Sequence, residues 1–267
     1  MPKDKERRDI DYYEISRKRS ERLLAYVRPP KVIEYGCGKG ATLSLLSENF
    51  RESSIVGLDT SITDLRTAND AKLEDLVFVK ADAMHQVFSP ETFNTAIFKF
   101  SLHEIFSRCG NTGINRAIRN AYDALVSHGV LIIYDHVRMR PQKVRMRIKN
   151  DVFKARFKRF SEEFEPRKIS FRVRGRWIEL DKTDCLEFLT KGNFHDWDAE
   201  KKEAHFYYTQ WQFRKCLEEL GFSIRAVRKY RLEEEIWKDK LKIANVDFDD
   251  PECFVLIAAE KVDRQDS

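Results

Sequence analysis

The sequence lacks several features that would assign it to well-known classes of protein. Its five cysteines include no Cys-x-x-Cys pair, which argues against a disulfide framework or a zinc site and favours free thiols in a reducing cytoplasm. They are scattered along the chain, at Cys37, Cys109, Cys185, Cys216 and Cys253. The longest apolar runs, 130–134 and 254–259, have only the length of strands and predict no transmembrane helix. No signal peptide is expected, because the charged first eight residues have no apolar stretch behind them. We therefore expect a cytoplasmic protein.

A strong net charge is also missing, but the charge that exists is uneven. The 267 residues include 49 Lys or Arg and 44 Asp or Glu, for a net charge of +5. Residues 138–176 hold 15 Lys or Arg and four Asp or Glu, a local charge of +11 that leaves −6 for the remainder. Such asymmetry indicates an anionic partner for the basic segment.

Strand-length apolar segments alternate with helical patterns through the first half of the chain. We expect strands at 31–35, 54–58, 76–80, 93–100 and 130–134. We expect helices at 10–27, after the glycines at 36–40, from Ser61, and over 114–125. This alternation predicts an α/β fold with a doubly wound, mostly parallel sheet.

The alternation stops at about residue 139 and resumes near residue 207. A helix over 209–220, ended by Gly221, and strands over 222–227 and 253–260 then follow. Because the interruption lies inside the sheet topology, it is an insertion rather than an appended domain. The expected division is a core of 1–136 and 208–267 with an inserted, α-rich segment of 137–207 after the fifth strand.

The first strand runs directly into a glycine-rich turn, Gly36-Cys37-Gly38-Lys39-Gly40. Such a turn lets a ligand approach the backbone closely and points free amide groups at it. Two spacings fit. Gly36, Gly38 and Ala41 match a dinucleotide-binding pattern, whereas Gly36, Gly38 and Gly40 match the G-x-G-x-G of adenosylmethionine-binding enzymes.

Carboxylates near the ends of three strands favour the second spacing. Glu34 would repel a pyrophosphate but suits a ligand that carries a sulfonium and an α-amino group. Asp59 ends the second strand, where it can accept from ribose hydroxyls, as it would in a dinucleotide site. Asp82 follows the third strand and can accept from an adenine amino group. Asp59 and Asp82 also have a purely structural interpretation, because Asp59 can cap a helix and Asp82 can shape a turn.

Taken together, these motifs resemble class I S-adenosylmethionine-dependent methyltransferases. The matching segments are 32–40, Val56-Gly57-Leu58-Asp59, Lys80-Ala81-Asp82-Ala83, 93–98, 125–133 and 213–222. The resemblance extends over residues 30–136 and 206–262, roughly 60% of the chain. It departs at Asn94, where the family commonly has Asp, and at Ser127-His128-Gly129, where it usually has Pro-Gly-Gly.

The resemblance implies a Rossmann-like sheet of seven strands whose last strand is antiparallel, with S-adenosyl-L-methionine as the cofactor. It carries Gly36, Gly38, Asp59 and Asp82 over as cofactor contacts. The expected cofactor-binding residues are Glu34, Tyr35, Gly36, Gly38, Gly40, Asp59, Thr60, Asp82, Ala83 and Phe100.

Two histidines follow strands at the edge where ligands bind in open α/β sheets. His103 lies just after the fourth strand and His136 just after the fifth. Because histidine titrates near neutrality, both are candidate catalytic bases. The alternative is that they only shape the pocket, while the enzyme works by holding the reactants together. No metal site is expected, because His195, Asp198 and His205 match no recognised ligand spacing.

The inserted segment combines the basic run with a dense group of aromatic residues. These are Phe188, Phe194, Trp197, Phe206, Tyr207, Tyr208, Trp211 and Phe213. Basic side chains neutralise phosphates or carboxylates, and aromatic rings stack on planar acceptors. The alternative is a solvated basic face, with the aromatic rings as the core that attaches the insertion.

We therefore expect methyl transfer to an O or N atom of an anionic or planar small molecule, with the insertion recognising this acceptor. One alternative is an RNA-directed methyltransferase or RNA-binding modification factor that uses the basic segment. A further alternative is an NAD-dependent oxidoreductase.

Overall fold

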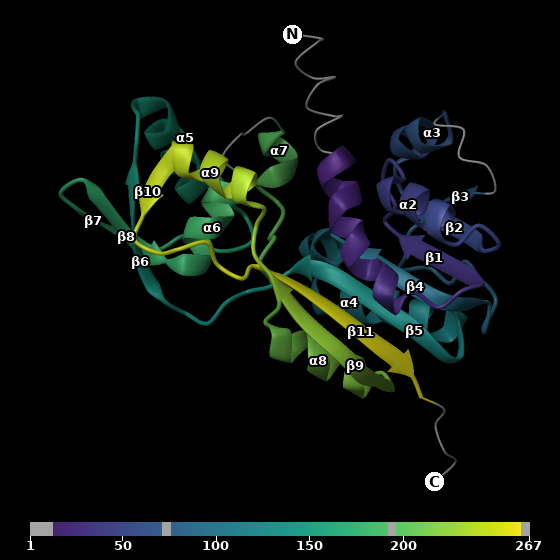
Figure 1. Ribbon diagram of the computed structural model, residues 1–267. Helices are drawn as coiled ribbons and strands as arrows, with labels where there is room; N and C mark the ends of the chain where they lie inside the picture. The colour runs from purple at the N-terminus through teal and green to yellow at the C-terminus, as the bar shows by residue number, and fades with distance from the viewer. Residues whose placement is uncertain (1–12, 71–75, 192–195, 263–267) are drawn as a thin grey trace.

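The computed structural model describes residues 13–70, 76–191 and 196–262 and forms the expected seven-stranded sheet (Figure 1). Its strand order is β3-β2-β1-β4-β5-β11-β9. The strands are β1 (Lys31–Tyr35), β2 (Ser54–Asp59), β3 (Leu76–Lys80), β4 (Phe93–Lys99), β5 (Leu125–His136), β9 (Phe222–Tyr230) and β11 (Phe254–Lys261). Strands β1 to β5 are parallel, and β11 is antiparallel to both β5 and β9. The prediction of a mostly parallel, Rossmann-like sheet of seven strands is confirmed.

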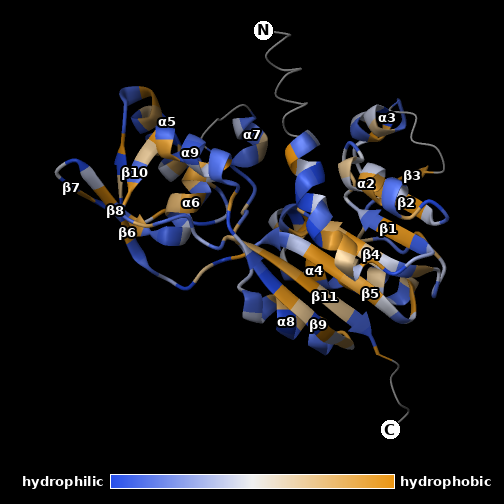
Figure 2. Cartoon of the chain, viewed as in Figure 1, coloured by the Kyte–Doolittle hydropathy of each residue, from blue (hydrophilic) through white to orange (hydrophobic). Residues whose placement is uncertain are grey.

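Helices cover both faces of this sheet. One face packs against η1 (Glu21–Tyr26), α2 (Ala41–Asn49) and α3 (Ile62–Asp70), and the other against α4 (Leu102–Ala124) and α8 (Gln210–Glu219). Neighbouring residues of a strand point to opposite faces, so Val32 belongs to the cluster of the first layer and Ile33 to that of the second. The central strands β5 and β11 are accordingly apolar along most of their length, whereas the edge strand β9 carries Arg225, Arg228 and Lys229 (Figure 2).

A second sheet lies beside the core, and its strands come from two parts of the chain (Figure 1). It is antiparallel, with the order β10-β6-β8-β7. Its strands are β6 (Lys143–Ile148), β7 (Phe171–Arg174), β8 (Trp177–Asp181) and β10 (Ala244–Val246). The helices that accompany it are α5 (Asp151–Glu163), α6 (Lys182–Thr190), α7 (Trp197–Glu200) and α9 (Glu234–Ile243).

This second sheet differs from the prediction in two ways. The insertion has more helical than strand residues, as expected, but its three strands, β6, β7 and β8, were not foreseen. The expected core segment 208–267 also contributes β10, whose Ala244 pairs with Ile148 of β6. The lobe beside the core is therefore assembled from the insertion and a return of the chain after β9.

The aromatic residues between 188 and 213, in the insertion and at the start of the following core segment, are mostly buried, as the alternative interpretation predicted. Phe188, Phe206 and Phe213 are fully buried, and Trp197, Tyr207 and Tyr208 are nearly so. Trp211 is the exception, with 67% of its surface exposed. Phe194 lies outside the described residues. Within the described part of the chain, no helix is both long and apolar enough to span a membrane.

Candidate functional site

The glycine turn between β1 and α2 closes tightly against the segment after β4. Gly36 has a φ of +78°, and a Cβ at this position would lie 2.4 Å from the Cβ of Ser101. Gly38 also has a positive φ, +50°, but a Cβ there would meet nothing within 4 Å. Gly36 therefore needs glycine both for its backbone and for space, whereas Gly38 needs it for its backbone alone.

Asp59, at the end of β2, holds this turn in place. One carboxylate oxygen accepts from the amide of Gly38 at 2.8 Å, and the other accepts from the amide of Ser61 at 2.8 Å. Asp82 is placed similarly after β3, where its carboxylate accepts from the amide of Met84 at 2.9 Å. Both side chains thus have local structural roles while remaining at the edge of the sheet.

A cavity of about 470 Å³ opens beside the glycine turn. Among the predicted residues it is lined by Glu34, Gly36, Gly38, Asp59, Thr60 and Phe100. An adjoining hollow of about 40 Å³ shares Gly36, Asp59 and Thr60 with it and is also lined by Tyr35, Asp82 and Ala83. Gly40 lines neither space. A Cβ at Gly40 would instead meet the Cβ of Ala68 at 3.1 Å, so this glycine lets α2 pack against α3.

Glu34 and Lys99 bring opposite charges into the buried part of this cavity. Both side chains are almost fully buried, and Glu34 Oε2 has no hydrogen-bond partner. Burial raises the pKa of Glu34, an effect that Lys99 partly offsets, and burial lowers the pKa of Lys99. Lys99 Nζ donates to Ser16 Oγ at 2.6 Å and to Thr42 Oγ1 at 3.3 Å. The site therefore offers a buried acid and a buried base side by side.

Phe100 follows Lys99 in a conformation that non-glycine residues seldom adopt. Its φ is +52°, and its amide donates to the carbonyl of Tyr134 at 2.8 Å. Its ring lies 5.2 Å from that of His136 and 5.3 Å from that of Phe254. Since strain of this kind persists only where surrounding contacts impose it, Phe100 marks the point at which the cavity meets the histidines.

The structure brings the two predicted histidines together with a third. The rings of His103 and His136 are 5.2 Å apart, and His205 lies 5.2 Å from the first and 4.8 Å from the second. Asp135 organises the group: it accepts from the amides of His103 and His136 and bonds to His103 Nδ1 at 2.8 Å. Tyr207 also donates to Asp135, at 3.4 Å.

The histidines differ in charge because their partners differ. Burial alone would lower the pKa of His103, but the Asp135 carboxylate raises it to about 9. Burial lowers the pKa of His136 to about 4, although its Nδ1 faces Asp135 Oδ1 at 3.4 Å. At neutral pH His103 is therefore protonated, while His136 is neutral.

Two groups of side chains place possible metal-binding atoms within 4.8 Å of one another: His103, Asp135 and His136, and His103, Glu203 and His205. The Asp135 oxygens already accept the hydrogen bonds described above. His205 already meets Thr190 Oγ1 at 3.1 Å and Lys191 Nζ at 3.3 Å. Of the residues considered in the sequence, Asp198 forms an exposed ion pair with Lys201, and His195 lies outside the described residues.

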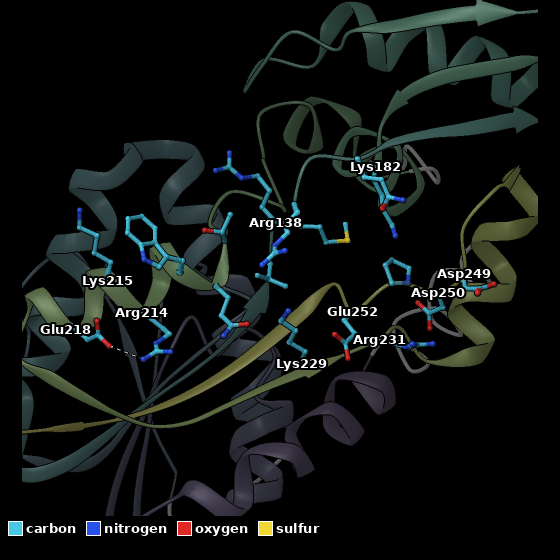
Figure 3. A pocket seen from close by; sticks show the side chains of 18 residues that line it. Arg138, Lys182, Arg214, Lys215, Glu218, Lys229, Arg231, Asp249, Asp250 and Glu252 are labelled. Atoms are coloured by element: carbon cyan, nitrogen blue, oxygen red, sulfur yellow. Dashed lines mark hydrogen bonds and ion pairs between the residues drawn. The ribbon is translucent and has the colours of Figure 1, made fainter.

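A larger cleft, of about 1040 Å³, lies where the core meets the second lobe (Figure 3). It begins at Val137 and Arg138, directly after the histidine at the end of β5. Seven Lys or Arg line it against four Asp or Glu. Figure 3 shows Arg214 and Lys215 on one side, Lys182 on another, and the acidic Asp249, Asp250 and Glu252 gathered together. Much of this lining is therefore strongly basic.

Sequence reasoning missed Lys99 and Ser16, and it considered His205 only as a metal ligand without a recognised spacing. Lys99 could have been found, because a lysine that ends the otherwise apolar strand β4 is unusual. Ser16 belongs to the helical segment 13–20, whose position over the cavity had no signal in the sequence. His205 reaches the other histidines only because the second lobe folds back onto the core.

The fold and its glycine-turn cavity are those of an S-adenosylmethionine-dependent methyltransferase. A family model described as "Methyltransferase domain" matches residues 6–227, and the chain belongs to that family. It is an enzyme of the transferase class, with S-adenosylmethionine as its cofactor.

Particular relatives resemble only part of the chain in sequence. Trans-aconitate 2-methyltransferase of Rhodopseudomonas palustris (strain HaA2) is 37% identical over 80 residues, which are 29% of this chain and 31% of that protein. The match thus spans about a third of the relative's length.

Two solved structures share the fold along most of their length. An S-adenosylmethionine-dependent methyltransferase from Mesorhizobium loti has a TM-score of 0.57 and 17% identity, over 91% of this chain and 96% of that one. The 1,6-didemethyltoxoflavin-N1-methyltransferase of Burkholderia thailandensis, solved with its acceptor and S-adenosylhomocysteine, has a TM-score of 0.55 and 12% identity, over 97% and 83%. At these identities the likeness concerns the fold alone.

Proposed function

We propose that this enzyme transfers the methyl group of S-adenosylmethionine to an O or N atom of an anionic acceptor. Glu34 carries the cofactor assignment: a buried carboxylate oxygen without a partner faces the cavity beside the glycine turn. A buried carboxylate oxygen that accepts no hydrogen bond is costly unless a ligand supplies a donor. The α-ammonium group at the methionyl end of S-adenosylmethionine is such a ligand.

The remaining cofactor contacts follow from this orientation. Asp59 accepts from the ribose hydroxyls with the lone pairs that its two backbone amides leave open. Asp82, with Tyr35 and Ala83, holds the adenine in the adjoining hollow. Gly36 and Gly38 let the cofactor approach the backbone, and Lys99 pairs with the methionyl carboxylate. The bound cofactor supplies a methyl group already activated by its sulfonium.

His136 is the proposed catalytic base. It is neutral at physiological pH, its Nδ1 faces Asp135 Oδ1 at 3.4 Å so that the other ring nitrogen can accept a proton, and its ring contacts that of Phe100 at the cavity wall. His103 is protonated and held by Asp135, so it positions the cluster rather than removing a proton. An acceptor whose reacting atom needs deprotonation would deliver that proton to the ring nitrogen of His136 that does not face Asp135.

We assign acceptor recognition to the insertion 137–207 together with α9 and β10, and cofactor binding to the remaining core. The basic cleft at their junction begins directly after His136 and suits an acceptor with negative charge. The relative from R. palustris is named for trans-aconitate, which is itself an anion. Both a small acid and RNA have this property.

Isothermal titration with S-adenosylhomocysteine tests the cofactor site. We expect one site per chain and a loss of affinity of about a hundredfold in Asp59→Ala, because two charge-assisted hydrogen bonds disappear. Asp70→Ala, an exposed aspartate of α3, is the matched control and should bind normally. Binding of NAD without S-adenosylhomocysteine would refute the proposal, as would unchanged affinity in Asp59→Ala.

A further inference from the structure

One face of the second sheet is open and strongly basic. In β6, Val144, Met146 and Ile148 are buried, whereas the alternate residues Lys143, Arg145 and Arg147 are exposed. Because side chains alternate across a strand, the three cations share one face of the sheet. This pattern places three of the fifteen cations of the basic run on a single surface rather than as scattered solvated charges.

Neighbouring strands extend this surface. Antiparallel pairing aligns Arg145 with Glu179 of β8, and Glu179 with Arg172 of β7, so these side chains lie on the same face. The guanidinium carbons of Arg145 and Arg147 lie 5.5 and 5.6 Å from the ring centre of Trp177. The surface therefore has an aromatic ring at its middle with arginines packed over it.

The acidic groups on this surface already have partners. Glu179 pairs with Arg174 at 3.5 Å, and Asp247 pairs with Arg145 at 2.9 Å. Asp181 caps α6 by accepting from the amide of Thr183. Among the residues that the structure describes, Lys143, Arg147 and Arg172 have no carboxylate within 4.0 Å. Positive charge is thus left over and exposed to solvent.

The basic face continues beyond the sheet at both ends. At the Lys143 end, Gln142 and Lys182 also line the basic cleft between the lobes. At the Arg147 end lies a hollow of about 940 Å³ whose charged lining residues, Arg147, Lys149, Lys154 and Arg176, are all basic. The six residues of β6 alone span about 20 Å. A small acid would engage only one or two of these cations.

We propose that this face and the adjoining cleft dock single-stranded RNA, which carries the acceptor atom. A row of cations follows a phosphate backbone, and an arginine-flanked tryptophan provides a stacking platform for a base, as single-stranded nucleic acids require. That the RNA receives a methyl group rests on the proposed function, whereas RNA binding can be measured without any methyl transfer.

The test is fluorescence anisotropy with a labelled, mixed-sequence RNA of 20 nucleotides, between 50 and 200 mM salt. Arg147→Glu/Arg172→Glu should weaken binding at least tenfold at 50 mM salt. The slope of log affinity against log salt should fall by about 1.4, or about 0.7 for each phosphate contact. The control, Arg116→Glu/Arg119→Glu, makes the same charge change at exposed positions on α4 and should bind within about twofold of the unmodified enzyme.

Substitutions of Trp177 distinguish the contribution of base stacking to RNA binding from that of charge. Trp177→Ala should weaken RNA binding about tenfold, and Trp177→Phe should restore most of it, since a phenyl ring still stacks. Thermal unfolding of each variant verifies that the sheet remains folded. A loss that Trp177→Phe does not recover, with the fold intact, contradicts the stacking role.

The inference is overturned if the unmodified enzyme does not bind RNA at 50 mM salt, or if the two double variants weaken binding equally. Binding to vesicles with 30% phosphatidylserine, but not to RNA, would make the face a membrane-docking surface instead. S-adenosylhomocysteine titration of the same samples keeps the two proposals apart. Normal cofactor binding without RNA binding refutes only the docking surface, whereas absent cofactor binding refutes the proposed function.

Discussion

Replacing Lys99 by Met should selectively remove recognition of the methionyl end of the cofactor. Methionine keeps the straight apolar stem but loses the buried ammonium group, which lies in the same cavity as Glu34. A hydrogen bond to a charged group contributes about 1.5–3 kcal/mol, so affinity for S-adenosylhomocysteine should fall about 10- to 150-fold. Glu34 would also lose its positive neighbour, and its pKa would rise further.

The decisive comparison uses methylthioadenosine, which has the adenosine and the sulfur but no amino-acid head. Its affinity, measured by titration calorimetry, should change less than about threefold in Lys99→Met, because no charged hydrogen bond is lost. Lys18→Met, at an exposed position on the helical segment near the cavity, is the matched control and should bind both ligands normally. Equal losses for the two ligands would show that Lys99 supports the pocket as a whole, and unchanged binding of both would remove it from the site.

Two further predictions concern the glycine turn and the histidine cluster. Gly36→Ala should lower the unfolding midpoint and the affinity for S-adenosylhomocysteine far more than Gly38→Ala, since only the first places a Cβ 2.4 Å from that of Ser101; similar effects would contradict this packing. Asp135, Glu104 and Glu203 face His103 and raise its pKa to about 9, above the value of about 6.5 in the unfolded chain. Protonated His103 therefore stabilises the folded protein fully below pH 6.5, and this contribution is lost as the pH rises through 9. Denaturant unfolding should therefore show a loss of up to about 3 kcal/mol between pH 6.5 and 9, which His103→Gln removes; an equal loss in that variant would assign it elsewhere.

The core of the fold could be predicted because its signals are local. The glycine turn, the strand β1 before it and the helix after it lie within 20 residues and agree with one another. The capping box between Thr209 and Gln212 likewise marks the start of α8 within four residues.

The second sheet could not be predicted for the opposite reason. Its strands are short, and β10 meets β6 only after nearly 100 intervening residues. In β6 the exposed residues are all basic, so the alternation of buried and exposed residues was hidden within a run of positive charge.

The residues of the predicted site also fall into those that local sequence could locate and those that it could not. Residues next to the glycine turn and at strand ends could be located from sequence, and nine of the ten expected cofactor residues line the two adjoining spaces. Gly40 was placed by its spacing but lies against Ala68 instead. Glu34 and Lys99 face a common cavity only because β1 and β4 are neighbours in the sheet. The local sequence of either strand does not indicate which strand it pairs with.

A crystal structure with S-adenosylhomocysteine tests the central claim most directly. The account predicts the ribose hydroxyls within hydrogen-bond distance of Asp59, the adenine beside Asp82, and the methionyl ammonium and carboxylate next to Glu34 and Lys99. The sulfur of S-adenosylhomocysteine should lie toward Phe100 and His136. A ligand bound outside this cavity, or with its methionyl end away from Glu34 and Lys99, would contradict the account.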